Sequence, residues 1–95
     1  MHEFDKQTNE TYLISGDFSD VLAEGEIISS VDVAAYIGDV DVTSLVIGST
    51  AIDGSDIVVR VQGGIDRRKY KIELTVTTSG ANIYEEEIYM TVWDK

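Results

Sequence analysis

Hydrophobic and polar residues alternate most regularly between residues 56 and 93. Turn residues divide this stretch into three expected strands, Asp56–Gln62, Lys69–Thr78 and Tyr84–Trp93. The apolar positions of the middle strand share one face: Tyr70, Ile72, Leu74 and Val76. An alternation of period two is the pattern of a strand with one buried face. We therefore expect these four residues to face a core.

The last two strands can be paired by matching their apolar faces. We expect an antiparallel hairpin in which Leu74 lies opposite Ile88. The same register pairs Ile72 with Met90, Tyr70 with Val92, Glu73 with Tyr89, Lys71 with Thr91 and Lys69 with Trp93. A shift by one residue would place Leu74 opposite Glu87, so the pattern opposes it. The remaining loop, residues 79–83, contains the Gly and Asn that tight turns favour.

Shorter elements are expected before this stretch. Apolar runs between turn residues give strands at 11–14, 26–37 and 48–53, and we expect the last of these to be a short edge strand. Residues 42–47 fit either a short strand or an irregular connection. About seven short strands with Gly-rich turns predict an all-β fold, an immunoglobulin-like antiparallel β-sandwich with one short helical turn near residues 18–24. The chain contains no proline, so charge or a partner must protect the edge strands.

The helical turn is inferred from its flanking residues. Asp17 or Ser19 can cap its start, and Gly25 can end it in the left-handed conformation. Phe18 and Leu22 lie four residues apart, on one side of such a turn. We expect them to close one end of the sandwich.

Length and composition indicate one domain with a modest core. We expect an N-terminal arm over residues 1–10, flexible or ordered by a partner, followed by a single β-sandwich domain over residues 11–95. The absence of cysteine excludes disulfides and thiolate metal sites, and it fits a reducing compartment. No apolar run approaches the roughly 20 residues that span a bilayer. The polar start of the chain does not resemble a secretory signal.

The formal net charge is −11. This charge disfavours nucleic acid and anionic membranes as partners, because phosphate binding needs clustered Lys and Arg. The basic run Arg67-Arg68-Lys69 fits either a solvated turn or an anion site. Strong acidity aids solubility, and it can also steer the domain toward a basic partner surface.

The sequence offers no catalytic constellation, so we expect no enzyme activity and no cofactor. His2 is the only histidine and lies in the expected arm, whereas a general base must be held within hydrogen-bond reach of its target. No base adjoins a serine to activate it, and no G-x-S-x-G motif occurs. Gly63-Gly64 is not followed by the Lys-Ser/Thr of a phosphate-binding loop.

Acidic residues in expected turns raise the question of calcium. They are Asp39, Asp41, Asp53, Asp56 and Asp66. Their spacing does not follow the calcium-loop pattern, and Asx-turns or surface charge explain them without a metal. We therefore expect no metal site, and calcium enters only with the alternative function below.

The second face of the last hairpin is the expected interaction surface. Lys69, Tyr89 and Trp93 gather there, in an arrangement that suits either a docking site or a lysine stem covering an aromatic ring. Charged residues complete the candidate interface: Glu85, Glu87, Arg67 and Arg68. Glu86 is expected on the core side opposite Val76, as an anchor for a basic partner or an inward charge that discourages edge aggregation.

Several short motifs resemble those of a family of small tailed-phage virion proteins, labelled phage fibre–tail adaptors. The motifs are Asp17–Leu22, Gly25–Ser29, Gly54–Val59, Gly63-Gly64, Tyr70–Ile72 and Thr77–Gly80. The resemblance covers roughly Tyr12 to Val92. It implies an immunoglobulin-like β-sandwich with a structural rather than an enzymatic role.

The chain also departs from the family pattern. Phe18 and Val21 stand where tryptophans are common, so a hydrophobic plug is preserved. Arg67 stands where a glycine is usual, and Ala81 stands where an arginine often follows the Ser-Gly of the last hairpin. The last two positions fall at loop tips, where partner contacts could differ.

The resemblance implies a virion structural or adaptor protein. Such a protein would make protein–protein contacts with tail, connector or fibre proteins, in multiple copies per particle, without nucleic acid or membrane. It would be made in the host cytoplasm and reside in the virion. The alternative is an immunoglobulin-like carbohydrate- or calcium-binding module of a bacterial surface protein, with Tyr89 and Trp93 as the sugar-contacting residues.

Overall fold

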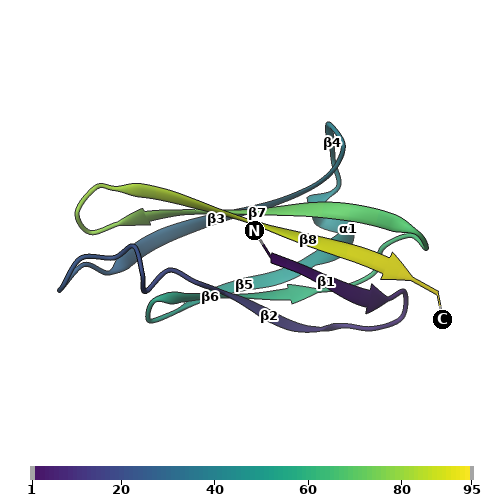
Figure 1. The fold of residues 1–95 in the computed structure, drawn as a ribbon, viewed down its shortest axis with the longest axis horizontal. Helices are drawn as coiled ribbons and strands as arrows, with labels where there is room; N and C mark the ends of the chain where they lie inside the picture. The colour runs from purple at the N-terminus through teal and green to yellow at the C-terminus, as the bar shows by residue number, and fades with distance from the viewer. Residues whose placement is uncertain (1, 95) are drawn as a thin grey trace.

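The computed structural model describes residues 2–94, which form two packed β-sheets (Figure 1). The larger sheet contains, in spatial order, β1 (His2–Gln7), β8 (Ile83–Trp93), β7 (Arg68–Thr78), β3 (Ile28–Ile37) and β4 (Val40–Asp41). The smaller contains β2 (Tyr12–Asp17), β6 (Asp56–Val61) and β5 (Ile47–Asp53). The all-β sandwich expected from the sequence is therefore confirmed.

The core lies between the two sheets and uses every second residue of the long strands. The predicted residues of β7 are at most 1% exposed: Tyr70, Ile72, Leu74 and Val76. Those of β8 are at most 4% exposed: Ile88, Met90 and Val92. The smaller sheet contributes Ile57, Val59 and Val61 of β6, all fully buried. The predicted core face of the hairpin is confirmed.

The register of that hairpin differs from the expected one by two residues. Ile72, rather than Leu74, lies opposite Ile88, and Leu74 lies opposite Glu86. Glu86 is therefore on the core side as expected, but its partner on β7 is Leu74 instead of the expected Val76. A shift of two residues keeps every side chain on its face, so hydrophobic alternation cannot distinguish the two registers.

The turn between β7 and β8 explains the shift. It is tighter than expected, because the N–H of Thr78 already donates to the carbonyl of Asn82 (2.9 Å). The N–H of Ala81 donates to the carbonyl of Thr78 (3.0 Å), and Ala81 has a φ of +62°. A type I turn followed by a left-handed residue is a common three-residue hairpin loop. The left-handed position falls on Ala81 rather than on the glycine before it.

The connection after β2 contains hydrogen-bonded turns, but no helix is assigned in residues 18–24, where the sequence predicted a short helical turn. The Asp17 carboxylate accepts a hydrogen bond from the N–H of Ser19 (2.8 Å), and the Phe18 carbonyl accepts one from the N–H of Val21 (3.1 Å). Phe18 is buried, and Gly25 adopts a φ of +80° where the segment leaves the turn. The ambiguous stretch before β5 instead contains a one-turn helix, α1 (Thr43–Val46).

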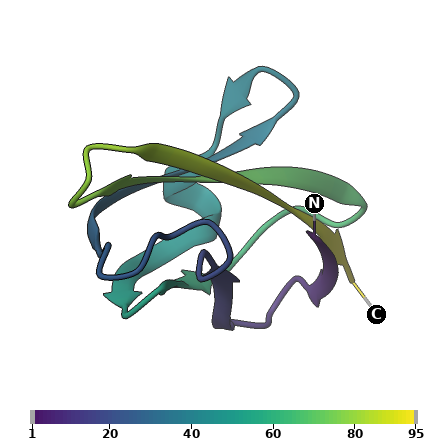
Figure 2. The same ribbon diagram turned by 60° about the vertical axis from the view of Figure 1, so that its left-hand side comes forward.

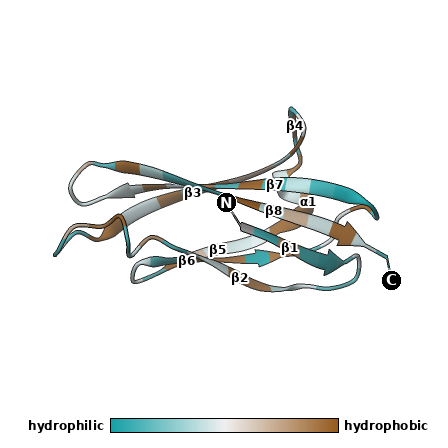
Figure 3. Ribbon diagram, viewed as in Figure 1, coloured by the Kyte–Doolittle hydropathy of each residue, from teal (hydrophilic) through white to brown (hydrophobic). Residues whose placement is uncertain are grey.

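The start of the chain lies in the sheet, whereas the sequence placed it in a separate arm. Strand β1 pairs in parallel with β8. Phe4 packs against the core and meets Tyr12 edge-on, with 6.1 Å between ring centroids. Lys6 is 1% exposed, and its ammonium donates to the main-chain carbonyls of Gln7 (2.6 Å) and Glu10 (2.7 Å). The strand is largely hydrophilic (Figure 3), so its period of two escaped the apolar pattern.

The molecule is elongated, with principal extents of 44 × 24 × 20 Å. The connections β2–β3, β5–β6 and β7–β8 lie together at one end, and the C-terminus lies at the other (Figure 1). The β3–β4 hairpin projects from the body of the sandwich (Figure 2). This arrangement leaves the second face of the larger sheet as a broad exposed surface.

Candidate interaction surface

We define the outer face as the side of the larger sheet that faces away from the core. It carries the interface candidates of β7 and β8 together with residues of the neighbouring strands: Glu3, Tyr36, Lys69, Lys71, Glu73, Glu85, Glu87, Tyr89 and Trp93. These residues alternate along their strands with residues that face the core side of the sheet. The sheet therefore holds charged and aromatic groups side by side on one surface.

Lys69 and Tyr89 meet on this face, as the sequence predicted. The ammonium of Lys69 lies 5.0 Å from the centre of the Tyr89 ring and 3.1 Å from the Glu3 carboxylate. The Tyr89 hydroxyl donates a hydrogen bond to Glu87 (3.3 Å). Lys69 is paired with Thr91, not Trp93, because of the two-residue shift. The contact has the form of a lysine over an aromatic ring, with a third partner from β1.

A second lysine repeats this arrangement on the other side of β7. The ammonium of Lys71 lies 5.8 Å from the centre of the Tyr36 ring and 3.6 Å from the Glu73 carboxylate. Glu73 lies directly opposite Glu87, and like charges placed opposite each other destabilise a sheet. Lys71 offsets the charge of Glu73 in this pair, and the Glu87 carboxylate accepts the hydrogen bond from Tyr89.

Trp93 lies at the end of β8 and is 37% exposed. It is opposite Gln7, and with Asp5 and Glu10 it borders a hollow of about 150 Å³. Burial raises the pKa of the neighbouring Tyr12 hydroxyl, and the nearby carboxylates act in the same direction. Trp93 is thus an exposed aromatic group beside a hollow that Asp5, Glu10 and the Lys6 side chain help to line.

The remaining candidates lie further apart. Arg67 and Arg68 lie where β7 begins, beside the end of β8, since the N–H of Arg67 donates to the carbonyl of Val92 (2.7 Å). The backbone of Arg67 has a φ of +65°. Its side chain is exposed, and the Nε atom lies 3.9 Å from the Asp66 carboxylate. Glu85 lies nearer the opposite end, across from Thr75. The structure therefore unites Lys69, Tyr89 and Glu87 but spreads the other candidates along the sheet.

Two contributors were missed by the sequence analysis. Glu3 fell within the expected arm, and Tyr36 fell within the expected strand at 26–37 without being singled out. The alternation of Phe4 and Lys6 with charged neighbours was the available signal for β1. It was hidden because a lysine occupies one of these two core-facing positions.

The acidic turn residue Asp41 is engaged within its own turn. Its carboxylate accepts hydrogen bonds from the hydroxyl (2.7 Å) and the N–H (2.9 Å) of Thr43, and these bonds lower the pKa of Asp41. Residues 2–94 contain no group of three or more His, Cys, Asp or Glu side chains placed to hold a metal ion. In the same part of the chain, no helix is long and apolar enough to cross a membrane.

The fold is a small β-sandwich whose larger sheet carries charged and aromatic side chains on its outer face. The family model Gp77, the podophage GP4 fiber-tail adaptor protein gp77, matches residues 6–91, and the chain therefore belongs to this family of phage fibre–tail adaptors. No curated protein matches the chain. The resemblance noted in the sequence is confirmed, and it indicates a structural role in the phage tail and a place in the virion. The family is one of structural adaptors, which do not form a class of enzymes.

Proposed function

We propose that this protein joins neighbouring components of a podophage particle, at the tail, connector or fibre attachment region, through its outer face. The observation that carries the proposal is the match to a fibre–tail adaptor family over nearly the whole sandwich. The partners would be tail, connector or fibre proteins, with several copies of the chain in each particle. The protein would be synthesised in the host cytoplasm.

The outer face supports this role through its chemistry. Exposed Trp93 and half-buried Tyr89 supply rigid aromatic contact area, and aromatic residues of this kind dominate the binding energy of many interfaces. The opposed carboxylates of Glu73 and Glu87 favour a partner with basic groups. Glu85, Arg67 and Arg68 would lie at the margins of such an interface. Several weak contacts of this kind would add together in a multivalent assembly.

We also propose that the sandwich is immunoglobulin-like in its topology. The order β8-β7-β3-β4 in one sheet and β2-β6-β5 in the other corresponds to the orders G-F-C-C′ and B-E-D of that fold. In this correspondence β1 is the first strand and has moved to the edge beside the last one. Comparison with solved structures at the level of strand order would test it.

The test of function is incorporation into particles. Phage lacking this chain would be complemented with the wild-type protein, Trp93→Ala, Tyr89→Ala or the control Leu13→Ala, and the copies per purified particle would be counted by quantitative mass spectrometry. Leu13 is exposed on the opposite sheet. We expect the outer-face variants to be depleted and the control to be retained. Particles that assemble and infect normally without the chain would overturn the proposal.

A further inference from the structure

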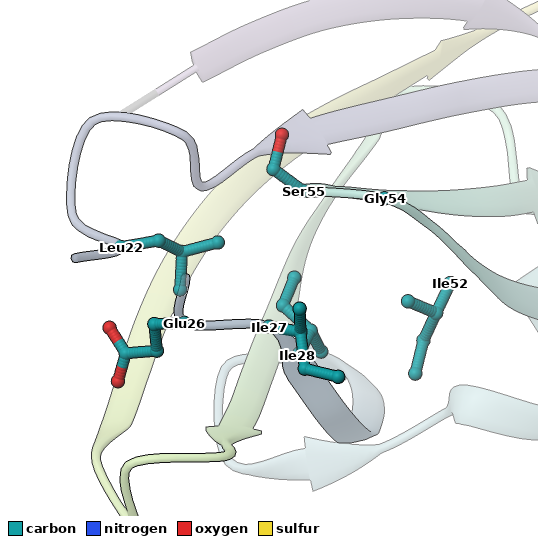
Figure 4. A pocket seen from close by; sticks show the side chains of 7 residues that line it. All are labelled: Leu22, Glu26, Ile27, Ile28, Ile52, Gly54 and Ser55. Carbon is teal, nitrogen blue, oxygen red and sulfur yellow. The ribbon is translucent and has the colours of Figure 1, made fainter. Parts of the chain in front are cut away.

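A second surface lies at the end of the sandwich that carries the β2–β3, β5–β6 and β7–β8 connections. A pocket of about 460 Å³ opens there, with a largely aliphatic lining from Leu22, Ile27, Ile28 and Ile52. Leu22 and Ile52 lie on opposite sides, with Ile28 between them (Figure 4). Ile27 is 63% exposed and Ile52 is 40% exposed. This apolar surface is separate from the outer face.

The pocket is rigidly built, because its rim is hydrogen-bonded to the β7–β8 hairpin. The Glu26 carboxylate accepts hydrogen bonds from the Thr78 hydroxyl and from the Asn82 side-chain amide (2.8 Å). The N–H of Ile27 donates to the Ser79 hydroxyl (3.1 Å), and the N–H of Ser79 donates to the Ile27 carbonyl (2.8 Å). Ile27 is therefore held in an exposed position. A site prepared in this way loses little conformational entropy when it binds.

The pocket adjoins an unprotected strand edge. Strand β5 is the outer strand of the smaller sheet, and no other described strand pairs with its second edge. All of its residues after Ile47 are exposed, and the stretch Gly48–Ile52 carries neither charge nor proline. Charged residues and proline are the usual means by which an edge strand avoids pairing with another chain. An extended segment of another protein can add to an edge that lacks them.

The charges around the pocket specify the chemistry of that segment. Residues 7–59 contain no Lys or Arg. The strands and connections at this end instead carry Asp17, Asp20, Glu24, Glu26, Asp53 and Asp56. Of these acidic residues, Glu26 is part of the pocket lining. An aliphatic pocket at an acidic end of the molecule is complementary to a segment in which aliphatic and basic side chains alternate.

We propose that this pocket and the edge of β5 bind an extended, basic segment of a neighbouring virion protein, which adds to β5 as a strand. Residues i, i+2 and i+4 of a strand share one face, so its aliphatic side chains would reach Ile27 and Ile52 while its basic side chains meet the carboxylates. The inference rests on the proposed role in the particle, and it supplies the chemical class of one partner.

The first test uses the isolated full-length chain and a short synthetic peptide that alternates lysine with valine. We expect the peptide to shift the backbone amide signals of Gly48–Ile52 in NMR spectra. The affinity should fall as salt is added, and a glutamate–valine peptide should bind at least about ten-fold more weakly. Equal shifts with both peptides, or shifts confined to other residues, would overturn the proposal.

Matched variants locate the binding site. Ile52→Lys and Ile27→Lys should each weaken lysine–valine peptide binding at least about ten-fold, because they add a like charge beside the pocket. Leu13→Lys is the control, since Leu13 is also exposed but lies on β2. Circular dichroism would confirm that each variant is folded. Unchanged affinity in both pocket variants would contradict the assignment.

A photo-cross-linking residue at position 52 then identifies the occupant in purified particles. We expect a cross-link to an extended segment with alternating basic and aliphatic residues in a different virion protein. A cross-link to a second copy of this chain would overturn the inference. Absence of the chain from particles would refute its proposed function instead, while the peptide assay would still decide whether the pocket binds such a segment.

Discussion

The buried ammonium of Lys6 provides the sharpest test of how β1 is held. Lys6→Met preserves most of the volume of the side chain and removes its donors. Two short hydrogen bonds to carbonyls would be lost, those to Gln7 and Glu10. A hydrogen bond to a charged group contributes about 1.5–3 kcal/mol, so the two bonds together amount to about 3–6 kcal/mol before the cost of burying the charge.

The cost of burying the Lys6 charge is reflected in the shift of its pKa. Burial lowers the pKa, while the carboxylate of Glu10 acts in the opposite direction. Desolvation therefore offsets part of the gain, and we expect a net loss of about 2–3 kcal/mol in the free energy of unfolding for Lys6→Met. For a domain of this size the melting temperature should fall by about 10–15 °C.

Urea denaturation followed by the fluorescence of Trp93, the single tryptophan, measures this change. Amide hydrogen exchange should show faster opening of His2–Gln7 in the variant. Lys69→Met is the matched control, because its ammonium is exposed and its ion pair with Glu3 is worth at most about 1 kcal/mol. Equal losses in the two variants, or no loss in Lys6→Met, would refute the reasoning.

Three further predictions concern loops. Arg67→Gly should raise the free energy of unfolding by about 0.5–1 kcal/mol, because glycine adopts the observed φ of +65° without strain; a decrease in thermal melts would contradict this. Gly64→Ala should cost about 2–4 kcal/mol, since a Cβ there would lie 2.7 Å from a Val92 methyl at a φ of +98°, whereas Gly38→Ala, in open space at +57°, should cost about 1 kcal/mol; equal costs in urea denaturation would exclude the steric argument. Hydrogen bonds lower the pKa of Glu26 below its ordinary value of 4.5, and the largest effect comes from the Thr78 hydroxyl. The ionised Glu26 carboxylate therefore contributes to the free energy of unfolding above that ordinary value, and this contribution is lost as the pH falls through the lower pKa of the folded state. The stability difference between wild type and Glu26→Gln should therefore shrink between about pH 6 and about pH 3, and a constant difference would count against this linkage.

The sequence predicted the long strands and their buried faces because each carries a strong alternation. The register of the last hairpin was wrong by two residues, since apolar faces match equally well in both registers. The deciding information was the turn, in which Ala81 rather than the preceding glycine adopts the positive φ. Propensity alone would place a glycine there.

Strand β1 was missed for a different reason. Its inward positions are Phe4 and Lys6, and a lysine is buried only when tertiary structure supplies its partners. Those partners are carbonyls of the connection to β2, which no local pattern reveals. The same limit applies to the outer face, where Lys69 was placed beside Tyr89 but Glu3, its partner from β1, was not identified.

The candidate surfaces were predictable only in part. Surface aromatics on the last strand were recognisable from their alternation with core residues. The end pocket was not, because Leu22, Ile27 and Ile52 belong to separate segments that come together only when the two sheets pack. The edge position of β5, by contrast, was expected for residues 48–53, and the strand order confirms it.

The parallel pairing of β1 with β8 has a mechanical consequence. The two strands run side by side in the same direction, from His2 beside Ile88 to Gln7 beside Trp93. A tensile load applied between the first and last strands would pull them along their common axis and strain all the bonds of this ladder at once. A load perpendicular to the strands would break the hydrogen bonds between β1 and β8 one after another. The geometry thus suits a part that must transmit force between two attached bodies without extending.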